Sequence, residues 1–286
     1  MDTDKKITFF SKNSIYCPLC DTKFFKEELF SGGGRLVAGK LTEELRRLYE
    51  PSKKFGEVFP LIYYVVVCPN CYYAAFPEDF TQLDEHGIKA LQPKGIARRQ
   101  ALSLLVQPVN FSQPRTLKEG LASYFLALES YEHFSKKNAP TIKRGIAALR
   151  ASWLAQDLHR KYPNENYDYL SRLFYRKAHF FYSEAMALEQ SGKETLSEAR
   201  NLGPDLDKNY GYDGVLYIMG LLEFHYGPRK NPLKRLERLS NIKRAISKSH
   251  GIGKASKSKP SAILDKAKDL YDEVGKEIAE LESAVR

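Results

Sequence analysis

The sequence lacks the features of an exported or membrane-spanning protein. Its longest apolar stretch, Leu61 to Val67, is far shorter than the ~20 residues that a membrane helix needs. The first residues, Met1 to Lys6, show no basic and then apolar export signal. With only four cysteines in 286 residues, the chain also has little capacity for disulfides, which belong to oxidising compartments. We therefore expect a cytoplasmic protein with no transmembrane segment.

The sequence also lacks a recognisable catalytic arrangement. None of its six histidines lies in a His-Glu-x-x-His pattern, and Gly32-Gly33-Gly34 is not followed by the Lys-Ser/Thr of a phosphate-binding loop. Glu129 and His133 lie four residues apart on an expected helix, which is typical of a surface pair. The sequence therefore predicts that the protein is not an enzyme.

Acidic residues are almost absent from one segment, which holds the whole positive charge of the chain. The net charge is +10, and residues 229–259 contain one acid, Glu237, so that the rest of the chain is neutral. Two interpretations stay open: a solvated helix face followed by a flexible loop, or a nucleic-acid or anion contact. The segment has no aromatic residue, which disfavours base stacking. Its basic residues are Arg229, Lys230, Lys234, Arg235, Arg238, Lys243, Arg244, Lys248, Lys254, Lys257 and Lys259.

The four cysteines form two matched Cys-Pro-x-Cys motifs. Cys17 and Cys20 make the first motif, and Cys68 and Cys71 make the second. In such a motif one tight turn directs two sulfur atoms at one metal ion, and the proline stiffens the turn. Two independent redox pairs are a less economical interpretation, and replacement of one ligand by His86 is a minor alternative. The sequence predicts a closed, structural Zn²⁺ site, with iron as the less favoured metal.

The pattern along the chain predicts an α+β protein that is mostly α-helical. Residues 1–80 are expected to form a small zinc-ribbon-like β module with a helical insertion between the two motifs. Strands are expected at Ile7 to Phe10, Ser14 to Tyr16 and Phe59 to Val67, and a short helix at Leu41 to Glu50. In that helix Thr42 would be the N-cap and Pro51 would follow the end.

Residues 81–286 are expected to form a tetratricopeptide-like helical domain. Thr116 to Glu119 is a capping-box signature, and helices are expected at 141–161, 167–190, 211–226, 232–247 and 261–284. Pairs of helices joined by short turns are typical of α-solenoids or compact bundles, although no strict 34-residue period is present. The Lys-, Ser- and Gly-rich stretch at about 248–260 reads as a basic, flexible insertion between the last two helices.

The two motifs and their neighbours resemble the bacterial "domain of unknown function 2225" family. The resemblance rests on both Cys-Pro-x-Cys motifs, on Tyr73 to Phe76 and on Leu149 to Leu154, and it covers roughly Ile15 to Phe224. Asp21 and Tyr72 depart from it, since small residues, often Gly, are usual there. The resemblance implies the fold and the metal, and it implies no reaction.

These observations predict a protein-interaction adaptor or scaffold. A structural metal would hold the first module, and a helical-repeat surface would recruit a protein partner. The alternative is a nucleic-acid-binding protein that uses residues 229–259.

Overall fold

The computed structural model describes residues 6–30, 32–250 and 261–285. Two short antiparallel hairpins carry the cysteine motifs. In the first, β1 (Thr8–Tyr16) pairs with β2 (Lys23–Leu29), so that Ile15 lies opposite Phe24. In the second, β5 (Val66–Val67) pairs with β6 (Ala74–Ala75). Each cysteine motif forms the turn of its hairpin. The predicted strand before the first motif is present as β1, and the end of the predicted strand before the second motif is present as β5.

The prediction of a helix at Leu41 to Glu50 is wrong. This segment forms a third hairpin, in which β3 (Val37–Leu41) pairs with β4 (Arg47–Glu50). Thr42 closes the turn: its N–H donates to the Arg46 carbonyl at 2.9 Å, and its hydroxyl accepts from the Arg46 N–H at 3.1 Å. Leu45 has a φ of 60° and is fully buried. Burial of Leu45 thus stabilises a left-handed turn that a helix cannot contain.

The strand predicted at Phe59 to Val67 is correct only at its end. Pro60 opens a 3₁₀ helix, η2 (Pro60–Tyr63), and β5 begins at Val66. Leu61, Ile62 and Tyr63 are all buried. A short continuous apolar run has no periodicity that separates a strand from a buried helical turn, which explains the error.

The helices from residue 116 onward agree with the sequence prediction. The Thr116 capping box is present, with its Oγ1 accepting from the Lys118 N–H and the Glu119 carboxylate accepting from the Thr116 N–H. Two short helices, which the sequence did not specify, precede it. The helices are α1 (Glu85–Leu91), α2 (Gly95–Leu105), α3 (Leu117–Ser130), α4 (Pro140–Lys161), α5 (Tyr167–Gln190), α6 (Gly211–Tyr226), α7 (Pro232–His250) and α8 (Ser261–Val285). Four single 3₁₀ turns connect them: η3 (Gln92–Lys94), η4 (Tyr131–His133), η5 (Lys136–Asn138) and η6 (Leu196–Ala199).

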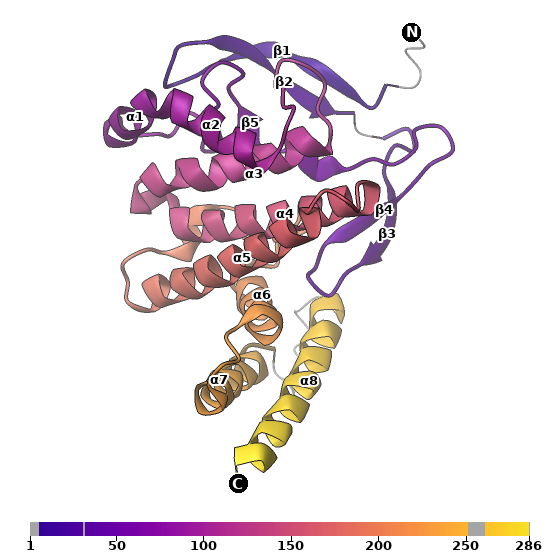
Figure 1. The fold of residues 1–286 in the computed structure, drawn as a ribbon, viewed down its shortest axis with the longest axis vertical. Helices are drawn as coiled ribbons and strands as arrows, with labels where there is room; N and C mark the ends of the chain where they lie inside the picture. The colour runs from indigo at the N-terminus through magenta and orange to yellow at the C-terminus, as the bar shows by residue number, and fades with distance from the viewer. Residues whose placement is uncertain (1–5, 31, 251–260, 286) are drawn as a thin grey trace.

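From α3 to α8 each helix packs on the next one in the chain, and α8 also contacts α6. Figure 1 shows α3, α4 and α5 as successive layers, with β1 and β2 above them and α6 to α8 below. The hairpin β3–β4 lies beside one end of α4. The fold class is therefore confirmed as mostly α with a small β part, whereas a tetratricopeptide-like repeat stays a prediction.

The cysteine hairpins and the helices share one hydrophobic core. That core runs from Cys17 to Val274. Polar contacts cross the predicted boundary near residue 80: the Tyr124 hydroxyl donates to the Leu61 carbonyl at 3.0 Å, and the Phe76 N–H donates to the Tyr131 hydroxyl at 3.0 Å. Among the helices of the described ranges, none combines the length and the apolar composition that crossing a bilayer would require.

Candidate metal centre

The two cysteine turns have the same backbone geometry. In the first, the Cys17 N–H donates to the Thr22 carbonyl at 3.1 Å and the Asp21 N–H donates to the Cys17 carbonyl at 3.0 Å. In the second, the Cys68 N–H donates to the Tyr73 carbonyl at 2.9 Å and the Tyr72 N–H to the Cys68 carbonyl at 3.0 Å. Each turn therefore presents two thiols on the same side of its hairpin.

Both turns end on a residue with a positive φ. Asp21 has a φ of 54° and Tyr72 a φ of 61°. Left-handed backbone is the conformation that glycine adopts at no steric cost. This explains why Gly is usual at these positions and why Asp21 and Tyr72 stand out. Tyr72 has compensating contacts, since its ring packs edge-on against Phe111 at a centroid distance of 5.3 Å and Arg99 lies over it.

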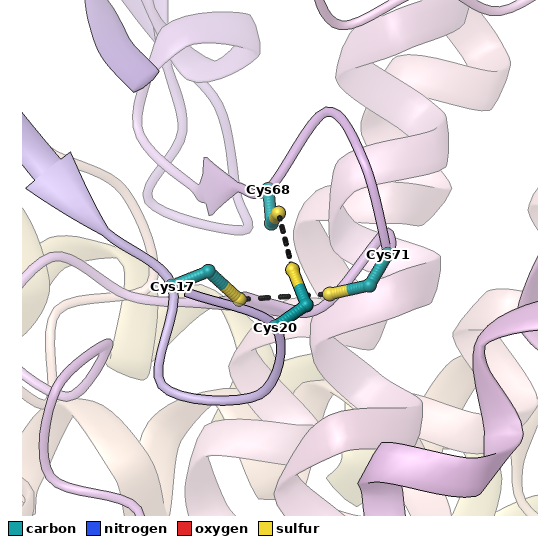
Figure 2. Close-up of side chains that lie close together, drawn as sticks. All are labelled: Cys17, Cys20, Cys68 and Cys71. Atoms are coloured by element: carbon teal, nitrogen blue, oxygen red, sulfur yellow. Dashed lines mark hydrogen bonds between the residues drawn. The ribbon is translucent and has the colours of Figure 1, made fainter. Parts of the chain in front are cut away.

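The four thiols converge on one point (Figure 2). The Cys17 and Cys71 sulfurs lie 3.5 Å apart, the Cys20 and Cys68 sulfurs lie 3.6 Å apart, and all four lie within 4.8 Å of one another. A tetrahedral metal with bonds of about 2.3 Å to sulfur requires sulfurs about 3.8 Å apart. The predicted residues are thus brought together in a geometry compatible with one metal ion. His86 is exposed and is not part of this group.

The thiols also perturb one another. Hydrogen bonds with the thiols of Cys17 and then Cys71 lower the pKa of the Cys68 thiol to about 4, and backbone N–H groups of Cys71 and Asn70 act in the same direction. The bond with Cys68 is also the main cause that raises the pKa of the Cys17 thiol. The cluster therefore favours a thiolate at Cys68, which is the form of cysteine that binds metals.

Residues outside the motifs hold the two turns in place. The Gln92 side chain donates to the Leu19 carbonyl at 3.1 Å. Arg98, on α2, donates from Nε to the Cys71 carbonyl at 3.1 Å and from Nη1 to the Leu91 carbonyl at 2.7 Å. Asn70 donates to the Thr22 hydroxyl at 3.0 Å, which links the first turn to the second. No sequence pattern indicated Gln92 or Arg98, because both lie far from the cysteines along the chain.

Arg98 places a buried positive charge beside the cysteine cluster. Its side chain is buried, and its Nη2 atom has no hydrogen-bond partner in the described part of the chain. A buried cation is stable only beside negative charge. Four thiolates around a divalent ion would carry a net charge of −2, so the donor set and the buried guanidinium both fit such a centre.

The basic residues predicted as an anion contact separate into three groups. Arg235 is buried, with Nε 2.9 Å from Glu277 and Nη1 2.7 Å from the Glu223 carbonyl, so it is unavailable to an external phosphate, and its inclusion is corrected. Arg229 and Arg238 are exposed but approach Glu277 and Glu223 at 3.1 and 3.8 Å. Lys230, Lys234, Arg244 and Lys248 are exposed and Lys243 is half-buried, whereas Lys254, Lys257 and Lys259 lie outside the described residues.

A family model described as "Uncharacterized protein conserved in bacteria (DUF2225)" matches residues 10–274. The chain belongs to this family. The chain is also similar to an "Uncharacterized protein" of Borreliella burgdorferi (strain ATCC 35210 / DSM 4680 / CIP 102532 / B31). The two are 45% identical over 277 residues, which cover 97% of this chain and 99% of the relative. No solved structure matches the chain. The resemblance of the cysteine motifs to the DUF2225 family is thereby confirmed.

Proposed function

We propose that this protein is a non-enzymatic, cytoplasmic adaptor in which Cys17, Cys20, Cys68 and Cys71 bind one structural Zn²⁺ ion. Four cysteine sulfurs fill a tetrahedral shell and leave no position for a substrate or a water molecule. Zinc is preferred over iron because an all-thiolate tetrahedral site without other chemistry is typical of structural zinc. The role of the metal is to fix the two hairpins against α2 and α3.

The observation that supports an interaction surface is a groove between the end of α2 and the start of α5. This cavity has a volume of about 390 Å³. Leu104 on α2 is 91% exposed and Tyr169 on α5 is 55% exposed, and both line it. A leucine that remains almost fully exposed gains nothing from folding, and exposed large apolar side chains beside a groove are typical of partner contacts. We propose that a protein partner covers Leu104 and Tyr169.

Two measurements test this proposal. Metal analysis of the purified protein is expected to give one zinc per chain, and Cys68→Ser is expected to lose it. Affinity capture from native cells is expected to recover a partner with the wild type and not with Leu104→Asp. Leu233→Asp is the matched control, since Leu233 is 62% exposed on α7 and lies outside the groove. A protein without zinc or iron, or equal capture by Leu104→Asp and the wild type, contradicts the proposal.

The same capture distinguishes the nucleic-acid alternative. Capture is carried out at two salt concentrations, with and without nuclease. Material that disappears with nuclease and with salt, and that depends on the exposed Lys234, Arg244 and Lys248, indicates nucleic-acid binding, because phosphate contacts weaken steeply as salt rises.

A further inference from the structure

A second cavity lies on the side of α4 where the β3–β4 hairpin packs. It has a volume of about 510 Å³, within the range of small-molecule sites. Residues of the hairpin, of the end of α4, of the start of α5 and Tyr226 of α6 line it. None of its lining residues belongs to the cysteine cluster or to the groove beside Leu104. The cavity is thus a separate candidate site.

The arginines of the cavity wall already have carboxylate partners. Arg46 forms a two-point ion pair with Asp157, and Arg160 pairs with the same aspartate. Arg172 pairs with Asp168 at 2.9 Å. Arg160 and Arg172 are also more than half exposed, so water solvates their remaining charge. The wall therefore offers no buried, unpaired cation to an anionic ligand.

Glu44 differs from the other charged residues of this wall because, in the part of the chain that the structure describes, it has no ion-pair partner. It lies in the turn of the β3–β4 hairpin and is half-buried, and in the described ranges no Lys, Arg or His lies within ion-pair distance of its carboxylate. Burial raises the pKa of Glu44, whereas the facing polar groups of Tyr175 and Trp153 and the charge of Arg46 oppose that rise. A bound cation would give the Glu44 carboxylate the ion-pair partner that the wall does not supply.

One further polar atom of the lining lacks a partner. The His159 Nδ1 is buried and has no hydrogen-bond partner in the described part of the chain, and His159 lines the cavity. An imidazole nitrogen without a proton can accept a hydrogen bond from a cationic group. Buried polar atoms without partners are rare in native proteins and call for an explanation such as a ligand or an ordered water.

The lining of the cavity also includes apolar and aromatic side chains. The rings of Tyr175 and Tyr226 stack in parallel, with centroids 4.4 Å apart and an angle of 9° between their planes. Leu48 contributes an aliphatic surface to the same wall. A flexible aliphatic stem that ends in a charge packs well on such a surface while its charged end reaches a polar group.

We propose that this cavity binds an ammonium or guanidinium group carried on an aliphatic chain, with the Glu44 carboxylate as its counter-ion. Tyr226 and Leu48 would contact the aliphatic stem, and the cationic end would form a charge-assisted hydrogen bond with Glu44. The source is either a lysine or arginine side chain of a protein partner or a free alkylamine. This inference goes beyond the adaptor role and holds whether or not a partner covers Leu104.

Binding is measured with four probes on the full-length protein at pH 8. They are n-butylamine, Nα-acetyl-lysine methylamide with its free ε-ammonium group, a pentapeptide with a central lysine, and Nα-acetyl-norleucine methylamide, which has an aliphatic stem and no charge. Trp153 is the only tryptophan of the chain and adjoins the site, so its fluorescence reports binding directly. Ligand-detected NMR gives a second readout that is independent of Trp153.

The cationic probes are expected to saturate the protein with Kd values on the order of 1 mM, as suits one charged side chain, whereas the uncharged Nα-acetyl-norleucine methylamide is not expected to bind. Glu44→Gln preserves shape and is expected to weaken binding at least tenfold. Glu43→Gln is the matched control, because Glu43 is the neighbouring acid, is exposed and does not line the cavity.

A pentapeptide that binds at least tenfold more tightly than butylamine indicates a protein source, and equal affinities indicate a free amine. Absence of saturable binding by every cationic probe, or equal binding by Glu44→Gln and the wild type, overturns the inference. Capture of a partner through the Leu104 groove is unaffected by Glu44→Gln, so that the two proposals fail separately.

Discussion

Lys143 forms a buried ion pair that joins the second cysteine hairpin to the helices, and its removal gives the sharpest test of how the fold is held. Its ammonium lies 2.8 and 2.7 Å from the two carboxylate oxygens of Asp79, with both side chains at most 5% exposed. The Tyr131 hydroxyl also donates to Asp79 at 2.6 Å. Lys143→Met removes the cation and leaves the Asp79 carboxylate with one neutral donor. Breaking one side of such a buried pair costs about 3–5 kcal/mol.

A surface pair on the same helix gives the matched control. Lys161 lies 2.8 Å from Glu57, but these side chains are 42% and 52% exposed. Lys161→Met is therefore expected to cost at most about 1 kcal/mol. Urea unfolding followed by circular dichroism measures both losses, and a colorimetric chelator measures the rate of metal release. Asp79→Asn together with Lys143→Met removes both charges and is expected to recover most of the loss.

The reasoning is refuted if Lys143→Met and Lys161→Met cost the same free energy of unfolding. It is also refuted if Lys143→Met destabilises the helices while metal release stays unchanged. The second outcome would mean that the cysteine hairpins do not share their stability with α4, although Asp79 follows the second hairpin directly.

Three further predictions concern the cysteine turns and the hairpin β3–β4. Asp21→Val is expected to cost about 1–2 kcal/mol in a thermal or urea melt while Asp21→Gly does not, because Asp21 is exposed and has a φ of 54° that a β-branched residue rarely adopts. Arg98→Met is expected to weaken metal binding by about 10- to 100-fold in a chelator competition, because Arg98 donates to the Cys71 carbonyl, whereas Lys89→Met is expected to leave it unchanged, because Lys89 is 80% exposed and pairs only weakly with Glu85. Glu43 raises the pKa of His225 and His225 lowers that of Glu43, so this pair stabilises the fold between the ordinary pKa values of the two groups and loses its effect as pH rises through the raised pKa of His225. Glu43→Gln is accordingly expected to lower the melting temperature at pH 5.5 and not at pH 8.5, and an equal effect at both pH values would contradict this assignment.

The helices were predictable because their information is local. The capping box at Thr116 and the apolar spacing that follows it determine where α3 begins, and α5 and α6 have the predicted limits. The β3–β4 hairpin was not predictable, because its turn depends on the burial of Leu45 in a core built by distant helices. Local helix signals at Thr42 and Glu43 were overridden by that packing.

The candidate metal site was likewise predictable only in the part that depends on local sequence. Spacing alone indicated the four cysteines, since each pair lies within one turn. The residues that support them come from α2 and the 3₁₀ turn before it, and only the fold brings Gln92 and Arg98 to the cysteine turns. The charge of residues 229–259 shows the opposite limit: a count of basic residues cannot tell the exposed Lys234 from Arg235, whose guanidinium is enclosed by Glu223 and Glu277.

The position of α2 connects the cysteine cluster to the proposed partner groove. Arg98 ties this helix to the Cys71 carbonyl, and Leu104 lies six residues further along the same helix. Because an eleven-residue helix is too short to be stable alone, its orientation depends on such tertiary contacts. A metal that closes the second cysteine turn would therefore also fix the angle at which Leu104 faces Tyr169. Under the proposed function, a structural metal and an interaction surface would thus be parts of one arrangement, in which the ion acts at a distance from the residues that would meet the partner.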